Sequence, residues 1–196
     1  MSRMSLDQAK LLFGFLTLLT NALVVWIAVM WLGSRFSSSI AGLRNATIET
    51  LRGATVPLAF LIASGATLGS LYLSEIANLA PCRLCWFQRI AIYPLMVVFG
   101  VAWLRKNASA WMYGIPLAVI GMGVSAYHLF LQRFPSFEGA ACEFGVPCSA
   151  IYFEVFGFMT IPYMAVSSTV GILALSAVAL AKSTSVRDSE PAAHGE

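Results

Sequence analysis

The chain has 196 residues, of which 59% are hydrophobic and 11% are charged. A soluble domain of this length could not bury so much apolar surface, whereas a membrane protein can turn it toward lipid. The net charge of +3 is small, and no cluster of basic and aromatic residues suggests nucleic acid. The composition predicts an integral membrane protein and argues against a nucleic-acid partner.

Five segments are nearly free of charge over about 20 residues, which is the length that a helix needs to cross a bilayer. In chain order they are residues 11–32, 53–74, 84–104, 111–131 and 155–181. Prolines fall inside the last four segments, and membrane helices tolerate them because neighbouring groups satisfy the freed carbonyls. We predict an all-α integral membrane protein with a four-helix transmembrane bundle plus one additional N-terminal transmembrane helix.

This pattern divides the chain into three parts. Residues 1–56 hold the N-terminal helix and a cytoplasmic linker, residues 57–182 hold the four-helix core, and residues 183–196 form a disordered cytoplasmic tail. Within the linker, residues 37–51 fit either a short helix on the membrane surface or a plain connection. Small residues spaced four apart, Gly65 with Gly69 and Gly121 with Ser125, indicate close packing between helices.

The first apolar segment follows Arg3 and Lys10, as the core of a signal peptide would. Its uncharged stretch is longer than the 7 to 15 residues usual for such a core, and cleavage would reverse the orientation of all later segments. We therefore expect a retained helix with its N-terminus outside.

The positive charges give the orientation. Seven of the twelve Lys and Arg residues fall on one side of a five-helix arrangement: Arg35, Arg44, Arg52, Arg105, Lys106, Lys182 and Arg187. An excess of Lys and Arg marks the cytoplasmic side. Both cysteine pairs then lie outside, where disulfides persist.

The first cysteine pair, Cys82 and Cys85, follows Pro81 and opens the third apolar segment. Proline suits the first turn of a helix, and a thiol at a helix N-terminus ionises more easily because of the helix dipole. Arg89 lies one turn deeper on the face of Cys85. A cation at that depth indicates function, either by stabilising the Cys85 thiolate or by holding a polar group of a ligand.

The second pair, Cys142 and Cys148, lies in the longest outer loop, residues 132–154. Gly145 and Pro147 allow the tight loop that a bridge between these cysteines would close. Such a bridge can be purely structural, or it can exchange with the first pair. The four thiols could also bind zinc together, which leaves a four-cysteine metal site as an alternative.

The runs PCRLCWFQRI, AYHLFLQRF, CEFGVPC and EVFGFMTIPYMA resemble the DsbB family of disulfide bond formation proteins, and most closely its short-loop, BdbC-like branch. The resemblance covers about residues 57–181. The helix over residues 11–32 lies outside the family's four-helix core.

The resemblance implies a membrane thiol:quinone oxidoreductase that supports disulfide bond formation in secreted proteins. An extracytoplasmic, DsbA-like thioredoxin-fold partner would reduce a Cys142–Cys148 disulfide, and the electrons would pass through Cys82 and Cys85 to ubiquinone or menaquinone. Arg89 matches the family arginine that contacts the quinone, and Cys85 would face the ring. His128 would either donate to a quinone oxygen or bond a neighbouring carbonyl.

Two other interpretations remain open. Enzymes of the vitamin K epoxide reductase family also combine a CxxC motif with loop cysteines, but there the loop pair precedes the motif in the chain. A non-catalytic membrane protein with two structural disulfides, or with the metal site described above, would use the same four residues differently.

Overall fold

The computed structural model describes residues 5–51, 53–139, 142 and 145–187. Long helices dominate this part of the chain: α1 (Leu6–Gly33), α2 (Ser38–Leu51), α3 (Thr55–Leu71), α4 (Arg83–Leu104), α5 (Trp111–Arg133) and α6 (Ile161–Arg187). Five of the helices in the described residues are long and apolar enough to cross a membrane, and α2 is the shorter one between them. The predicted all-α membrane fold is confirmed.

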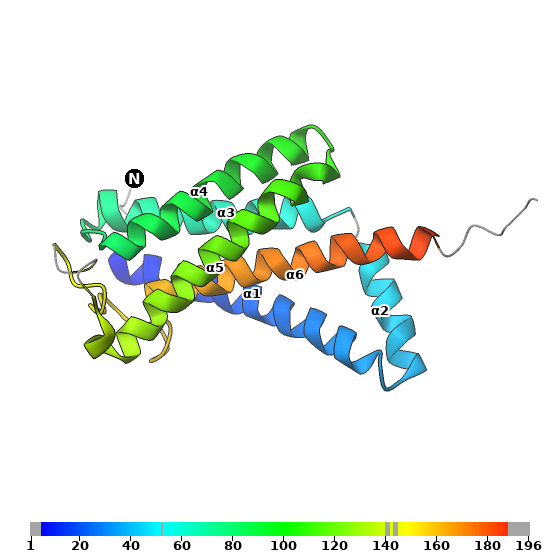
Figure 1. Cartoon of the computed structure of the whole chain (residues 1–196), viewed down its shortest axis with the longest axis horizontal. Helices are drawn as coiled ribbons and strands as arrows, with labels where there is room; N and C mark the ends of the chain where they lie inside the picture. The colour runs from blue at the N-terminus through cyan, green and yellow to red at the C-terminus, as the bar shows by residue number, and fades with distance from the viewer. Residues whose placement is uncertain (1–4, 52, 140–141, 143–144, 188–196) are drawn as a thin grey trace, which may run out of the picture.

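Helices α3, α4, α5 and α6 form the bundle, and α1 packs beside α6 and α3 (Figure 1). The buried core of the bundle joins Leu95 and Phe99 of α4 to Trp111 of α5 and to Ile172 and Leu175 of α6. Because these buried residues all come from α4 to α6, with alanines of α3 beside them, the core matches the predicted four-helix bundle. Helix α1 is the additional helix.

Helix α1 begins five residues before the predicted segment. Ser5 caps the helix: its hydroxyl accepts the Gln8 amide hydrogen, and the Gln8 side chain accepts the Ser5 amide hydrogen. This reciprocal pair satisfies two of the amides that a helix start leaves free. The polar residues Asp7 and Lys10 therefore join the first turns as an ion pair, with 3.2 Å between Nζ and Oδ1.

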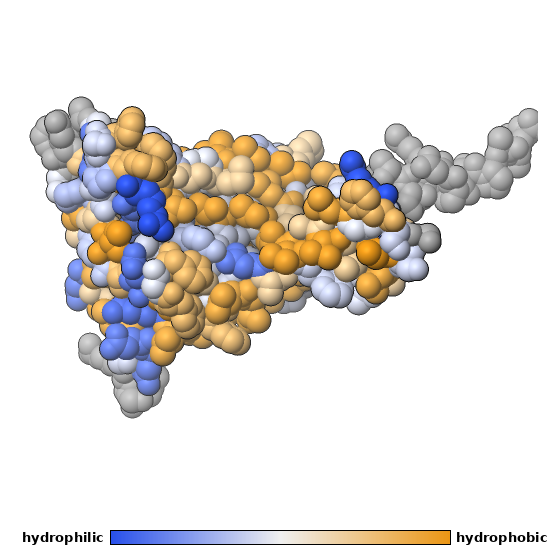
Figure 2. Space-filling model, turned by 90° about the horizontal axis from the view of Figure 1, so that it is seen from below, coloured by the Kyte–Doolittle hydropathy of each residue, from blue (hydrophilic) through white to orange (hydrophobic). Residues whose placement is uncertain are grey.

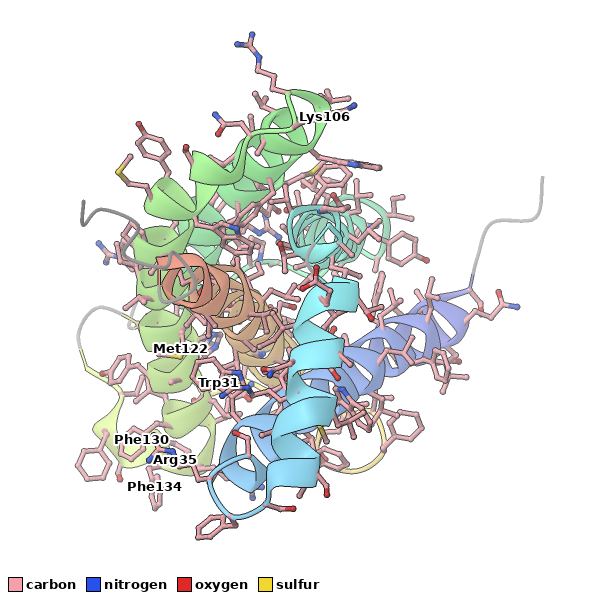
Figure 3. All side chains as sticks on the ribbon, turned by 90° about the vertical axis from the view of Figure 1, so that its right-hand side faces the viewer. Trp31, Arg35, Lys106, Met122, Phe130 and Phe134 are labelled. Atoms are coloured by element: carbon pink, nitrogen blue, oxygen red, sulfur yellow. A yellow bond between two sulfur atoms is a disulfide. The ribbon has the colours of Figure 1, made fainter. Side chains whose placement is uncertain are left out.

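Helix α2 settles the choice between a helix and a plain linker for residues 37–51. It runs across the end of the bundle where α1 finishes (Figure 1), and it crosses in front of the other helices when the molecule is viewed from that end (Figure 3). A helix lying across the long axis of the bundle is suited to the membrane surface.

The predicted start of the last segment, at residue 155, was wrong, whereas the apolar span ends at Ala181 as predicted. Residues 155–160 form a tight turn in which Val155 and Met159 exchange two backbone hydrogen bonds, and the helix begins only at Ile161. Gly157, with φ +76°, takes the left-handed conformation that a helix cannot contain. At the other end α6 continues to Arg187, past the predicted boundary at residue 183. Residues 182–187 contain no glycine or proline that would end it.

The rest of the predicted tail, residues 188–196, lies outside the described residues.

Hydrophobic residues cover the middle of the face shown in Figure 2, and hydrophilic residues gather at the end that carries the loops between α3 and α4 and between α5 and α6. This distribution fits a bundle whose middle lies in lipid and whose end meets water. We call this the cysteine end, because Cys82, Cys85, Cys142 and Cys148 all lie there.

Candidate functional site

Both cysteine pairs meet in one small cluster at the cysteine end. Cys82, Cys142 and Cys148 are buried together against Leu84 and Leu131, and Cys85 packs at the edge of this cluster. The expectation that the two pairs share one end of the bundle is therefore confirmed. Proximity of this kind is the first requirement for exchange of electrons between two dithiols.

The first pair is positioned by the start of α4. Cys82 is the N-cap residue, and its Sγ accepts the backbone amide hydrogen of Cys85 at 3.3 Å. The Sγ atoms of Cys82 and Cys85 are 2.7 Å apart, and both cysteines carry free thiols. A disulfide requires about 2.05 Å between its sulfurs, so a small movement closes the bond.

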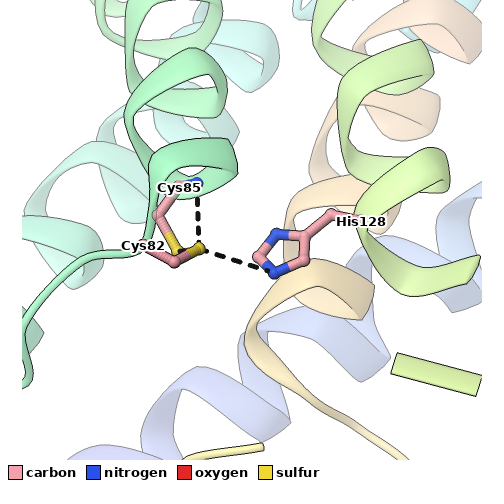
Figure 4. Close-up of side chains that lie close together, drawn as sticks. All are labelled: Cys82, Cys85 and His128. Atoms are coloured by element: carbon pink, nitrogen blue, oxygen red, sulfur yellow. Dashed lines mark hydrogen bonds between the residues drawn. The ribbon is translucent and has the colours of Figure 1, made fainter. Parts of the chain in front are cut away.

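His128 of α5 lies against this pair (Figure 4). Its Nε2 is 3.7 Å from Cys82 Sγ and 3.0 Å from the carbonyl oxygen of Cys148. Since a carbonyl only accepts hydrogen bonds, Nε2 carries the hydrogen. The imidazole thus touches one cysteine of each pair.

The Cys82 thiol is set up to ionise. The hydrogen bond from the Cys85 thiol lowers the pKa of Cys82 most, burial opposes this, and the hydrogen bond and charge of His128 lower it further, to about 4. A thiolate is the reactive form of cysteine in exchange. Of the two thiols, Cys82 therefore has surroundings that favour the thiolate.

The second pair is a disulfide on the loop between α5 and α6, as the sequence led us to expect. Gly145 takes φ +93° in this loop, which explains why the tight turn needs a glycine there. Both sulfur-bearing residues are buried, Cys148 fully. Access to the bond from solvent therefore requires that part of the loop move.

Glu138, in the first half of the loop, holds the second half by hydrogen bonds. Its carboxylate accepts hydrogen bonds from the amides of Cys148 and Ser149 and, at 2.6 Å, from the Ser149 hydroxyl. These bonds, that of the hydroxyl most, hold the pKa of Glu138 below its ordinary value. Farther along, the Tyr152 hydroxyl donates to the carbonyl of Ala80, just before Pro81.

A cavity of about 390 Å³ opens beside Cys85, between α1, α3, α4 and α6. We call it the central cavity. Its size falls within the roughly 300–1,000 Å³ typical of small-molecule sites. Polar side chains line it near the cysteine end: Ser70, Cys85, Gln88, Arg89, Tyr93 and Tyr152. Most of its other lining residues are apolar.

Arg89 lies in this cavity with Cys85, as their shared helix face predicted. Its Nε donates to the Ser70 hydroxyl at 3.1 Å, and its Nη2 donates to the Ser70 carbonyl at 3.3 Å. The guanidinium also stacks over the Trp86 ring, 5.2 Å from the centroid, and the Tyr93 hydroxyl donates to Ser70. Arg89 is thus held facing the cavity, and the pattern of α4 alone did not identify Ser70 or Tyr93.

Gln88 is a further site residue that the sequence pattern did not identify. It is buried, it lines the central cavity, and its Nε2 has no hydrogen-bond partner among the described residues. A buried donor without a partner costs about 1–3 kcal/mol, so an acceptor is expected there. A polar residue in an apolar span was the available signal.

His128 lies apart from the central cavity. The described residues that line the cavity do not include it, whereas it lines a space of about 10 Å³ together with Cys82 and Cys85. Of its two expected contacts, the structure contains the one to a neighbouring carbonyl, that of Cys148. Cys85 lines both spaces and stands between His128 and the cavity.

The donor set also bears on the metal alternative. Cys142 and Cys148 are joined to each other, and thiolates are the form that binds zinc, so a four-cysteine site would first require reduction of this bond. Cys82, Cys85 and His128 do bring three ligand atoms within 4.8 Å of one another.

Comparison with known proteins points to one family. Residues 52–180 match the family model described as disulfide bond formation protein DsbB. The chain is 43% identical over 115 residues to Disulfide bond formation protein C of Bacillus subtilis, which covers 58% of this chain and 83% of that protein. It is 42% identical over 120 residues to Probable disulfide formation protein C 2 of Bacillus anthracis, covering 61% and 84%. No solved structure matches the chain significantly.

Proposed function

This chain belongs to the DsbB family of disulfide bond formation proteins and is a multi-pass bacterial membrane protein, and we propose that it is a thiol:quinone oxidoreductase that reoxidises a DsbA-like partner. One observation carries the proposal: the Cys82–Cys85 pair lies between the loop disulfide and the central cavity. The pair can therefore take electrons from one side and release them on the other.

The first exchange involves the loop. A thiolate of the partner attacks the Cys142–Cys148 disulfide, and the partner's two thiols become a disulfide while the loop pair becomes a dithiol. The loop dithiol then reduces a Cys82–Cys85 disulfide and returns to its bridged form. The arrangement described above, with the loop pair bridged and Cys82 and Cys85 free, corresponds to the product of this second exchange.

The last step returns Cys82 and Cys85 to a disulfide. One proton leaves when Cys82 ionises; the Cys82 thiolate, 2.7 Å from Cys85 Sγ, then forms the S–S bond as the Cys85 thiol loses its proton and the pair gives up two electrons. A quinone in the central cavity would supply the acceptor for these electrons and protons and leave as the quinol.

The residues of the cavity fit such a ligand. The unpaired Gln88 Nε2 and the Arg89 guanidinium are donors, and the two carbonyl oxygens of a quinone are acceptors. Arg89 also offsets negative charge near Cys85 in a site of low dielectric. A strong dithiol oxidant such as DsbA has a reduction potential near −120 mV, so its reoxidation needs an electron acceptor that is at least comparably oxidising. A quinone of the membrane can be such an acceptor.

The test is a reaction with purified protein. Given a reduced thioredoxin-fold dithiol and ubiquinone or menaquinone, the protein should convert one quinone to quinol for each partner disulfide formed. Turnover without quinone consumption would refute the quinone step. Stoichiometric zinc in the purified, reduced protein, together with absence of turnover, would favour the metal alternative instead.

We propose further that the cysteine end faces the outside of the cell. Arg35, Arg44, Arg105 and Lys106 all belong to α2 or to connections at the opposite end, as the positive-inside rule requires of a cytoplasmic side. After reduction of intact cells, a membrane-impermeant alkylating reagent should label Cys142 or Cys148. Labelling that appears only after lysis would mean the inverted orientation.

A further inference from the structure

The region that matches the family begins at residue 52, so helix α1 lies outside it. Helix α1 nevertheless helps to enclose the central cavity. It contributes Phe13, Leu16, Thr17, Leu19, Thr20 and Leu23 to the lining. Most of these residues recur every three or four positions and so form one face of the helix. From Phe13 to Leu23 the face is about 15 Å long.

Close packing against α6 and α3 fixes this wall. A Cβ placed on Gly171 of α6 would lie 2.6 Å from Thr20 Cγ2, so only glycine permits this approach of the two helices. Asn21 Nδ2 also donates to the Tyr163 hydroxyl at 3.1 Å. On the α3 side, the Phe13 ring contacts Gly69.

The wall that α1 provides is apolar in its chemistry. The Thr17 hydroxyl donates to the Phe13 carbonyl at 2.8 Å, and the Thr20 hydroxyl donates to the Leu16 carbonyl at 3.0 Å. Both hydroxyls are therefore satisfied within the helix and are not available to a ligand as donors. The opposite wall, by contrast, carries the polar groups around Cys85 and Arg89.

The cavity is also longer than a quinone ring requires. Its lining runs along α3 from Ser70 to Leu58, a distance of about 18 Å along the helix. Midway, a Cβ placed on Gly65 would meet no heavy atom within 4 Å, so the missing side chain contributes open space. A polar end beside Cys85 and a long apolar remainder match a ring that carries an isoprenoid tail.

We propose that α1 is the fourth wall of the quinone site, holding the isoprenoid tail and making this chain selective for long-tailed quinones. The inference rests on the proposed function, since it concerns the same cavity. It assigns to the additional helix a role in ligand specificity that the four-helix core does not supply.

Quinone binding to variants of the full-length protein, with one substitution on α3 and one on α1, tests the proposal. Gly65→Phe and Thr17→Phe each place a ring in the apolar part of the cavity. Gly123→Phe is the matched control on α5, because Gly123 is exposed and also has open space at its Cβ. Leu18→Phe is the control on the other face of α1, where the side chain is exposed.

The probes are tetraprenyl menaquinone and ubiquinone and their tailless ring analogues, with binding followed by the shift in thermal unfolding. Gly65→Phe and Thr17→Phe should weaken tetraprenyl binding by about tenfold or more and tailless binding by less than about twofold. The two controls should change neither. Unchanged tetraprenyl binding, or equal loss for both kinds of probe, would overturn the proposal.

Photolabelling of the wild-type protein needs no variant and so does not depend on how the variants fold. A tetraprenyl quinone with a photoreactive group on its tail should label residues 13–23. Labels confined to α3–α6 would overturn the role of α1 and leave the quinone site intact. If no quinone, tailed or tailless, binds or labels the wild type, the proposed function fails as well.

Discussion

The two cysteine pairs are held in different ways. Cys85 belongs to the first turn of a transmembrane helix, and Cys82 is the residue that caps this helix. Cys142 and Cys148 belong to a loop that is held by the side chain of Glu138. A helix end keeps its sulfurs in a fixed place relative to the cavity, whereas a few hydrogen bonds can be broken when a partner docks. We therefore call Cys82 and Cys85 the fixed pair, and Cys142 and Cys148 the movable pair.

The largest effect should come from removing the sulfur that borders the cavity. In Cys85→Ser, turnover with partner and quinone should fall at least about a thousandfold, because no disulfide can form at the helix end. The loop pair should still oxidise one equivalent of partner dithiol in a single-turnover experiment. Sustained turnover in this variant would contradict the route through Cys85.

Arg89→Met tests the cavity side of the fixed pair. Loss of a hydrogen bond from a charged donor costs about 1.5–3 kcal/mol, so the apparent quinone affinity should weaken roughly ten- to a hundredfold. The thermal unfolding midpoint should change little, because the role of the cation is local. Arg83→Met, at an exposed arginine in the first turn of the same helix, is the control. Equal quinone affinity in wild type and Arg89→Met would count against the assignment.

His128→Asn tests how the fixed pair is activated. Because His128 lowers the pKa of Cys82, the substitution should raise that pKa above its value of about 4. The thiolate absorbance of the reduced wild-type protein should persist from about pH 8 to about pH 5, and in the variant it should be lost at higher pH. His194→Asn, which removes the other histidine of the sequence, should leave the titration unchanged. A titration that does not move in His128→Asn would rule out this influence.

Glu138→Gln addresses the movable pair and should have the smallest effect. Weaker hydrogen bonds should speed amide hydrogen exchange at Cys148 and Ser149 by a few-fold to about tenfold. Glu154→Gln, at an exposed glutamate of the same outer region, should not.

The same residue gives a pH dependence. Since folding lowers the pKa of Glu138, its stabilising contribution is present above the ordinary value of about 4.3 and is lost as the pH falls through the lower value of the folded state. Acid should therefore loosen the wild-type loop, whereas Glu138→Gln should show the looser loop already at neutral pH. Equal protection of the Cys148 and Ser149 amides from hydrogen exchange in the two proteins at neutral pH would refute the role of Glu138 in holding the loop.

Hydropathy predicted the spans well because lipid imposes a length and an absence of charge on every crossing helix. The predicted spans also implied that both cysteine pairs lie at the same end of the bundle. Helical periodicity placed Cys85 and Arg89 on one face. The central cavity could not be predicted, because it depends on which residues of α1 and α3 face α4. Glu138 was missed for a similar reason: it reaches Cys148 across ten positions of irregular loop, where no periodicity applies.

Glycine shows the same limit. The pairs Gly65 with Gly69 and Gly121 with Ser125 suggested close helix packing. Gly69 and Gly121 do contact neighbouring side chains, of Phe13 and Thr169 respectively, but Gly65 borders open space. The sequence spacing is identical, so only the position of the neighbouring helix distinguishes a glycine in close packing from one that borders open space.

The shortness of the loop limits how far its sulfur can travel. The Cys148 amide donates a hydrogen bond to Glu138, and the Tyr152 hydroxyl donates one to the carbonyl of Ala80. These bonds hold both ends of the segment that follows the bridge. Once the bridge opens, Cys142 stays linked along the chain to Cys148 by six residues and to Glu138 by four, and the shorter link spans at most about 14 Å when fully extended. Under the proposed function, the reactive thiol of the partner must itself approach within this short distance of the residues that Glu138 and Tyr152 hold in place.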